Sequence, residues 1–139
     1  MPKNQSTDVL KEENLYPLTS YQRDIWIQQC LYPNRQLYNI GAYFVIEGSV
    51  DYEIFQKAIN ILIEENDALR INIIKKDGQY YQKIHPQLNY HVDFHDFSKQ
   101  NNPIKECLEW IENETIKPFD LYNNFLFKYS LIKVNENLF

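Results

Sequence analysis

Cysteine, glycine and net positive charge are scarce in this 139-residue sequence. The two cysteines, Cys30 and Cys107, form neither a Cys-x-x-Cys pair nor a disulfide framework, so we expect two buried or half-buried free thiols. Three glycines exclude collagen-like and glycine-rich linker sequences. The chain has 14 Lys plus Arg against 19 Asp plus Glu, a formal net charge of -5, which predicts no nucleic-acid partner held through its phosphate backbone.

Long apolar runs are also lacking. No stretch approaches the ~20 apolar residues that cross a bilayer, and residues 1–14 lack the apolar core of a signal peptide. We therefore expect a cytoplasmic protein with no membrane partner. Because residues 1–14 are mostly polar and charged, the prediction for residues 1–15 is a flexible leader or linker.

Apolar and aromatic side chains, by contrast, are abundant. Hydrophobic residues make up 44% and aromatic residues 15% of a chain whose length fits one domain or part of one. Hydrophobic periodicity predicts the order helix, strand, helix, hairpin, strand, helix, strand, which is an α+β fold with helices packed on a mixed β-sheet. The predicted helices begin at Thr19, after Asp51 and after Asn102, and the predicted strands are residues 38–47, 70–75, 80–85, 90–94 and 125–134.

Capping and turn sequences mark several of these boundaries. Thr19 and Gln22 have the spacing of a capping box, in which each side chain bonds to the other residue's backbone amide. Asp77-Gly78 supplies the positive φ angles of a tight hairpin turn. The strand predicted over residues 38–47 is apolar on both faces, which favours a core position. The second helix is predicted to bury a stripe formed by Ile54, Phe55, Ala58, Ile59 and Leu62.

Residue types alone give no complete active site. His91 and His95 have the i, i+4 spacing of a zinc-binding helix, but they lie in a strand-like segment, where residues four apart are roughly 13 Å from each other. No serine lies in a nucleophile-elbow sequence, and the glycines form no phosphate-binding loop. The prediction from residues is therefore no catalytic group and no metal site.

Two stretches of the sequence resemble motifs of the condensation domains of nonribosomal peptide synthetases. Residues 16–26 are similar to the family's opening Ser-x-Ala-Gln-x-Arg-(Leu/Met)-(Trp/Tyr) motif, with Ser20, Gln22 and Trp26 at matching positions and Asp24 where an arginine is expected. Residues 65–70 are similar to the family's Arg-His-Glu-x-Leu-Arg motif, of which Leu69 and Arg70 match outright. In the family the first arginine of that motif is thought to support the catalytic loop, and this chain has Glu65 there.

Two further stretches follow in the order expected for this family. Asp96-Phe97-Ser98 resembles the Asp-Leu-Ser that precedes the third helix, and Pro118-Phe119-Asp120-Leu121 resembles the Pro-Phe-Asp-Leu segment before the next strand. The last match is the most specific. The resemblance covers residues 16–139 and identifies them as the N-terminal lobe of a condensation domain, with Pro118, Phe119 and Asp120 among its structural motif residues.

This resemblance implies a chloramphenicol-acetyltransferase-like half-domain and a role in amide bond formation. Condensation domains join aminoacyl or peptidyl thioesters that are carried on the phosphopantetheine arms of carrier domains, and they bind no cofactor directly. The family's His-His-x-x-x-Asp-Gly motif does not occur in this sequence. We expect the chain to be cut short before that motif, to need the missing C-terminal lobe as a partner, and to be inactive alone.

The resemblance also suggests where a carrier domain docks. The helix that begins after Thr19 resembles the one near the acceptor carrier's docking face, and its candidate contacts are Tyr21, Arg23 and Gln28. Other functions remain open at this point. The chain fits a sibling domain for heterocyclisation or epimerisation, a free-standing acyltransferase, a non-catalytic carrier-docking lobe, or an unrelated ligand-binding α+β domain.

Overall fold

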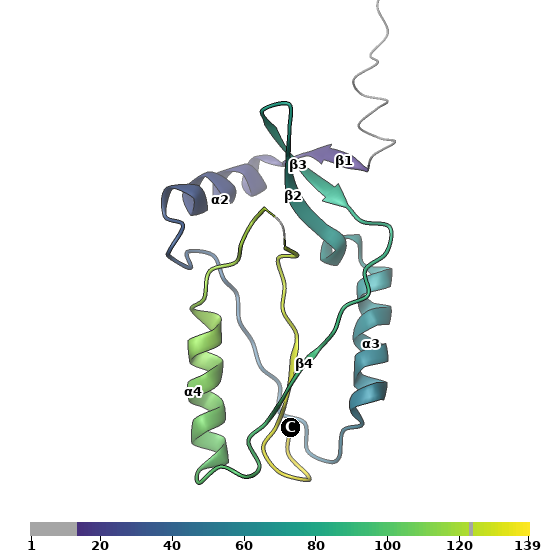
Figure 1. The fold of residues 1–139 in the computed structure, drawn as a ribbon, viewed down its shortest axis with the longest axis vertical. Helices are drawn as coiled ribbons and strands as arrows, with labels where there is room; N and C mark the ends of the chain where they lie inside the picture. The colour runs from purple at the N-terminus through teal and green to yellow at the C-terminus, as the bar shows by residue number, and fades with distance from the viewer. Residues whose placement is uncertain (1–13, 123) are drawn as a thin grey trace, which may run out of the picture.

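The structure, a computed structural model, describes residues 14–122 and 124–139. Figure 1 shows helices α3 and α4 on opposite sides of several extended segments, with α2 and a β-hairpin at one end. The elements in chain order are β1 (Leu15–Pro17), α2 (Ser20–Leu31), α3 (Tyr52–Glu65), the 3₁₀ helix η1 (Asp67–Arg70), β2 (Ile71–Lys76), β3 (Gln79–Ile84), β4 (Asp93–Asp96), α4 (Pro103–Thr115) and β5 (Ser130–Lys133).

The helix starts follow the capping chemistry of the sequence. Thr19 and Gln22 form the predicted capping box, with the Thr19 amide donating to Gln22 Oε1 at 2.8 Å and the Gln22 amide donating to Thr19 Oγ1 at 3.2 Å. The side chains of Asp51 and Asn102 cap α3 and α4, and Pro103 is the first residue of α4. All three predicted starts are confirmed, because each depends on residues within one turn of the helix.

The strands form both antiparallel and parallel pairs. β1, β3 and β2 make an antiparallel sheet in that order, and β4 pairs with β5 in parallel. The predicted hairpin is confirmed: Lys76 pairs with Gln79 across Asp77 and Gly78, whose φ angles are 50° and 76°. The α+β class is confirmed as well, with the antiparallel and parallel pairings divided between two small sheets.

The core lies between α3 and the β4–β5 pair. It is centred on the buried residues Ile59, Ile63, Val92 and Leu131. The predicted apolar stripe of α3 was partly wrong, because Ile63 is fully buried whereas Ile54 is 67% exposed. Apolar residues occupy more than one face of this helix, so periodicity alone did not choose the face that packs.

Polar side chains replace strand pairing where residues 90–92 pass α3. Gln56 Nε2 donates to Tyr90 O at 2.7 Å, and the Val92 amide donates to Gln56 Oε1 at 2.8 Å. These bonds satisfy the backbone that a neighbouring strand would otherwise pair. The strand predicted over residues 90–94 is therefore observed as β4, Asp93–Asp96, shifted toward the C-terminus.

A similar replacement shortens the last predicted strand. The phenol of Tyr90 accepts from the Tyr129 amide at 2.7 Å and donates to the Tyr129 carbonyl at 3.2 Å. Of the predicted residues 125–134, only Ser130–Lys133 form a strand, β5.

Residues 38–47 depart most from the prediction. The segment is extended, but only Glu47 forms a bridge, to Leu138, and its apolar side chains are exposed, Ile40 at 99% and Phe44 at 86%. The predicted core strand was therefore wrong for this chain, because no described residue covers either side chain.

Two smaller expectations were also wrong. Leu15, assigned to the leader, lies in β1 and is 2% exposed, while the rest of the predicted leader up to Glu13 lies outside the described residues. Cys107 is buried as expected, but Cys30 is exposed, since α2 lies at one end of the lobe and contributes no residue to the central core cluster.

Candidate functional site

Helix α2 is attached to the hairpin through two residues of the first motif. Gln22 Nε2 donates to Gln82 Oε1 at 3.0 Å, and the ring of Trp26 stacks against Tyr80 with centroids 4.2 Å apart. Tyr80 and Gln82 are two apart on β3, so they lie on the same face of the strand. Ser20, the third matching residue, is exposed at the first position of α2.

The fourth motif reaches the same aromatic cluster. Asp120 Oδ1 accepts from the Tyr122 amide at 2.9 Å, forming a turn that directs Tyr122 toward Tyr80, with ring centroids 5.9 Å apart. Tyr122 Oη also lies 3.0 Å from Cys30 Sγ. Burial of the phenol and its contact with the Cys30 thiol raise the pKa of Tyr122 to about 12. Tyr122 therefore stays a neutral phenol at physiological pH.

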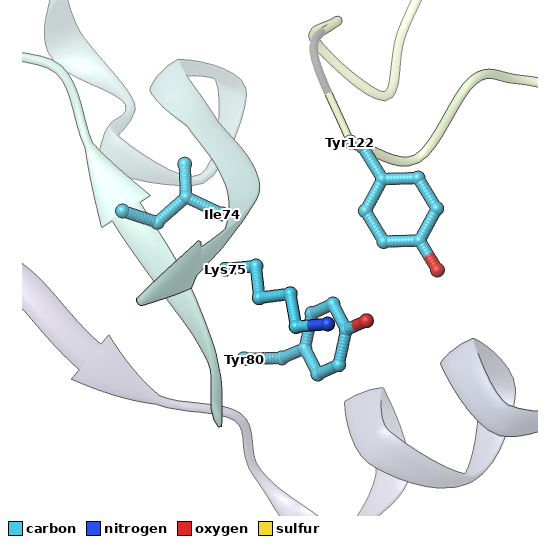
Figure 2. Close-up of a pocket in the computed structure, with 4 residues that line it drawn as sticks. All are labelled: Ile74, Lys75, Tyr80 and Tyr122. Carbon is cyan, nitrogen blue, oxygen red and sulfur yellow. The ribbon is translucent and has the colours of Figure 1, made fainter. Parts of the chain in front are cut away.

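An open cavity of about 590 Å³ lies beside this cluster, lined by Ile74, Lys75, Tyr80 and Tyr122. Figure 2 shows Tyr122 reaching toward it from one side and the other three side chains from the hairpin. The Lys75 ammonium lies 5.5 Å from the centroid of the Tyr80 ring, within reach of a cation–π interaction. The cavity thus combines aromatic walls with one positive charge.

The predicted docking residues lie around a second, smaller cavity or on the exposed surface of α2. Arg23 and Trp26 line a cavity of about 310 Å³ together with Tyr80. Tyr21 is 82% exposed, and Gln28 accepts a hydrogen bond from the Tyr38 hydroxyl. Tyr21 and Arg23 are thus available to a partner, whereas Gln28 also positions the chain that follows α2.

Arg70, the final residue of the second motif, is buried and joins α3 to the hairpin. Its guanidinium donates to Ile63 O at 2.6 Å, His85 O at 2.9 Å and Asp67 Oδ1 at 2.5 Å, and also to Glu64 O. Two of these acceptors are carbonyls at the C-terminal end of α3, where the helix supplies few donors of its own; Ile63 O also accepts from the Asn66 amide at 3.3 Å. Arg70 is therefore a structural support.

The remaining motif residues differ in how far they are buried. Leu69 is half-buried and packs against the central core, while Glu65 is exposed at the end of α3. Phe119 is half-buried, and Pro118 and Asp120 are exposed. The first and fourth motifs thus meet at Tyr80, near the turn of the hairpin, whereas the second motif lies at the hairpin's open end.

The histidines occupy three unrelated environments. His85 Nε2 lies 3.0 Å from Asn72 Oδ1, His91 Nδ1 lies 3.3 Å from the Tyr52 hydroxyl, and the His95 ring stacks on Trp110 at 4.2 Å. Within residues 14–122 and 124–139, no group of three or more His, Cys, Asp or Glu side chains is arranged to hold a metal ion. Nor is any helix in those ranges long and apolar enough to cross a membrane.

The protonation of His85 is expected to destabilise the fold. Burial, together with the nearby Lys83 ammonium, lowers the pKa of His85 below its ordinary 6.5. The unfolded chain therefore binds a proton more readily, so stability should fall as the pH drops below 6.5. Urea unfolding at a series of pH values should show a smaller fall for His85→Gln than for the wild type. Parallel pH profiles would contradict this prediction.

Sequence reasoning did not find Tyr80, Tyr122 or Lys75. The period-two pattern of β3 was a usable signal, because it placed Tyr80 and Gln82 on one face beside a helix rich in glutamine and apolar residues. No comparable signal existed for Tyr122, whose position depends on contacts between segments far apart in the chain.

Helices packed beside a short antiparallel sheet and a parallel strand pair make an α+β lobe, in which the first and fourth motifs meet at Tyr80 and the second lies at the open end of the hairpin. The condensation-domain family model matches residues 12–139, so the chain belongs to the condensation-domain family. It is 31% identical over 129 residues to surfactin synthase subunit 1 of Bacillus subtilis (strain 168), covering 91% of this chain and 4% of that protein. It is 30% identical over 124 residues to a dimodular nonribosomal peptide synthase of the same organism, and this match covers 89% of this chain and 5% of that protein.

Solved condensation domains share the fold. The starter condensation domain of the rhizomide synthetase RzmA is 32% identical with a TM-score of 0.83, covering 89% of this chain and 30% of that chain. A mutant form of that domain, in complex with C8-CoA and Leu-SNAC, is 30% identical and also has a TM-score of 0.83. That match covers 99% of this chain and 31% of that chain. The first condensation domain of the CDA synthetase, at 19% identity and a TM-score of 0.78, matches in fold. The family match rules out an unrelated ligand-binding domain.

Proposed function

We propose that this chain is the N-terminal lobe of a condensation domain that forms amide bonds in nonribosomal peptide synthesis. The observation that carries the proposal is the 0.83 TM-score at 32% identity to the starter condensation domain of the rhizomide synthetase. The chain spans about 30% of that structure, so the complete reaction belongs to a longer protein. In that protein, residues 15–139 form the lobe, since Leu15 is buried in β1, and residues 1–14 form a leader or linker; the enzyme works in the cytoplasm.

The substrates in this proposal are two thioesters on the phosphopantetheine arms of carrier domains. The amine of one attacks the carbonyl of the other, an amide forms, and the thiol of the donor arm leaves. An unperturbed α-amine has a pKa near ~8, so a useful fraction is the free base at neutral pH. Holding the two tethered groups in line supplies much of the rate. The His-His-x-x-x-Asp-Gly motif of the family belongs to the remaining part of the domain.

The part of this lobe that meets the acceptor carrier is proposed to be the exposed surface of α2. Tyr21 offers an 82% exposed ring, and Arg23 offers a positive charge beside the cavity that it lines with Trp26. Carrier domains with an acidic docking face would be attracted to Arg23. Trp26 and Gln22 hold the helix against the hairpin, so the docking residues are presented on a fixed support.

The proposal predicts that Arg23→Glu weakens acceptor use. The parent synthetase, supplied with loaded donor and acceptor carriers, should form an amide product detected by mass spectrometry. Arg23→Glu should raise the KM for the acceptor carrier about tenfold with little change in kcat, because a peripheral charge acts mainly on encounter. Lys57→Glu, the same charge change on an exposed position of α3, is the matched control.

Three outcomes separate the alternatives. No condensed product from the wild-type parent, with carriers still bound, indicates a non-catalytic docking lobe. A product that has lost a further water indicates heterocyclisation, and an inverted stereocentre without condensation indicates epimerisation. Equal KM values for Arg23→Glu and Lys57→Glu would contradict the placement of the carrier on α2 while leaving the reaction class intact.

A further inference from the structure

Hydrogen-bond donors from two separate segments border the larger cavity. Lys75 and Tyr80 are direct partners across the hairpin, so their side chains leave the same face of the sheet. Tyr122 approaches from the chain after α4, with its ring centroid 5.9 Å from that of Tyr80. Figure 2 shows Lys75 and Tyr80 on one side of the open space and Tyr122 on the other. One ammonium and two phenol side chains therefore line the same cavity of about 590 Å³.

The positive charge at this cavity has no counterion among the described residues. Lys75 forms no ion pair within residues 14–122 and 124–139, and its ammonium lies 5.5 Å from the centroid of the Tyr80 ring. The Tyr80 hydroxyl likewise has no hydrogen-bond partner in those ranges. A cation–π contact at an exposed position is weak compared with a charge-assisted hydrogen bond to an anion. Both groups are therefore available to a negatively charged ligand.

The Tyr122 hydroxyl remains protonated at physiological pH. Burial and the contact with the Cys30 thiol raise the pKa of Tyr122 to about 12. The Tyr122 oxygen lies 3.0 Å from Cys30 Sγ, and a hydroxyl can accept from a thiol while it donates its own proton to a ligand. Asp120 fixes the approach of this residue by accepting from its amide at 2.9 Å. Tyr122 is thus held at the cavity with a proton to donate.

The rest of the cavity lining is apolar. Ile74 contributes an aliphatic side chain, and Tyr80 and Tyr122 contribute ring surface. The Tyr80 ring also packs on Trp26, with centroids 4.2 Å apart, which holds the ring in position. Ligand pockets of about 300–1,000 Å³ typically combine mostly apolar walls with a few convergent polar groups. The size and the lining of this cavity both fit that description.

We propose that this cavity binds a small organic monocarboxylate. The carboxylate accepts from the Lys75 ammonium and from the hydroxyls of Tyr80 and Tyr122, and the apolar body of the ligand packs against Ile74 and the tyrosine rings. A single negative charge matches the single ammonium, whereas a phosphate dianion would leave one charge without a partner. The inference goes beyond the proposed function and does not rest on it, because every group it uses lies in the described part of this lobe.

Acylation of Lys75 reports directly on occupation of this cavity. The full-length protein that contains this lobe is treated with a limiting amount of N-hydroxysuccinimidyl acetate, and each modified lysine is quantified by mass spectrometry of the digested protein. The probe is 4-phenylbutyrate, which has both the charge and the apolar body. Neutral 4-phenylbutan-1-ol tests the body alone, and acetate tests the charge alone. Lys57, exposed on α3, is the internal control.

About 10 mM 4-phenylbutyrate should slow the acylation of Lys75 about tenfold, since a fragment of this size binds a matched site with a Kd on the order of 1 mM. The alcohol and acetate should slow it less than about twofold, because each lacks one part of the interaction and binds at least about tenfold more weakly. Lys57 should react at the same rate throughout. Equal protection of Lys75 and Lys57, or equal protection by the acid and the alcohol, overturns the proposal.

Tyrosine variants test the two hydroxyls. Tyr80→Phe and Tyr122→Phe keep the ring and should each raise the Kd of 4-phenylbutyrate about tenfold, because each loses a hydrogen bond to a charged group. Tyr81→Phe is the matched control, since Tyr81 follows Tyr80 on β3, points to the opposite face and donates to Gln79 Oε1. An unchanged Kd in both Tyr80→Phe and Tyr122→Phe overturns the proposal.

Carrier domains loaded with glutamate or leucine then identify the source of the carboxylate. Protection of Lys75 by the glutamyl carrier but not by the leucyl carrier assigns the ligand as the side chain of a tethered substrate. Protection by 4-phenylbutyrate and by neither carrier assigns it as a free acid, and both outcomes support the site. Protection is measured without product formation, so a failure of the proposed amide-forming function is distinguished from a failure of this site.

Discussion

Replacing Arg70 with methionine should lower the free energy of unfolding by about 3–5 kcal/mol, because the change removes the guanidinium donors from three backbone carbonyls at this junction. The Arg70 side chain is 9% exposed and donates to the carbonyls of Ile63, Glu64 and His85. Methionine fills similar space without donors. Ile63 O would then keep only its bond from the Asn66 amide, at 3.3 Å, and Glu64 O would lose its Arg70 donor.

The salt bridge of Arg70 should contribute little to this loss. The Asp67 carboxylate is 72% exposed, so water screens its attraction to the guanidinium. Asp67→Asn should therefore cost less than about 1 kcal/mol. Arg70→Lys keeps the charge, but lysine has no planar guanidinium to reach acceptors on both sides of the junction. Its loss of unfolding free energy should therefore lie between the losses for Arg70→Met and Asp67→Asn.

Urea unfolding followed by circular dichroism measures these differences. Arg23→Met, at an exposed position of α2, is the matched control and should change the free energy of unfolding by no more than about 0.5 kcal/mol. If Arg70→Met and Asp67→Asn have the same effect, the ion pair supports this junction and the carbonyl contacts do not.

Features set by neighbours within one turn were predicted well from the sequence. The capping box of Thr19 and Gln22 and the Asp77-Gly78 turn each depend on chemistry within four residues, and both are present. Strand boundaries were predicted less well. Gln56 and Tyr90 supply side-chain partners to backbone groups that the sequence pattern assigned to strands.

The candidate site was likewise predicted only in part from the sequence. Resemblance located Gln22, Trp26 and Arg70, and the structure gives each of them a specific contact. It did not locate Tyr80 or Tyr122, whose roles arise where α2, the hairpin and the chain after α4 meet. Contacts between segments so far apart in sequence leave no local pattern to read.

The exposed segment at residues 38–46 shows that an apolar sequence pattern does not by itself determine burial. Its two apolar faces were interpreted as core, yet the described residues cover neither face at Ile40 or Phe44. Burial depends on neighbours as well as on the residue itself.

Ile63→Ala should cost about 2–5 kcal/mol in the free energy of unfolding, because it opens a cavity at the centre of the core. Ile63 is fully buried in α3, in the cluster that includes Val92, which precedes β4, and Leu131 of β5. The same change at Ile61, two residues earlier and 55% exposed, should cost less than about 1 kcal/mol, since little apolar surface is lost there. Both substitutions replace isoleucine with alanine in one helix, so their helix propensities change equally.

Ile63→Val refines the test, because removing one methylene group should cost about 0.5–1.5 kcal/mol at a tightly packed position. Urea unfolding of the three variants gives the comparison directly. Equal losses for Ile61→Ala and Ile63→Ala would mean that α3 packs through a different face. The stripe predicted from periodicity, with Ile54 and Leu62 as its ends, would then be the better description of the core.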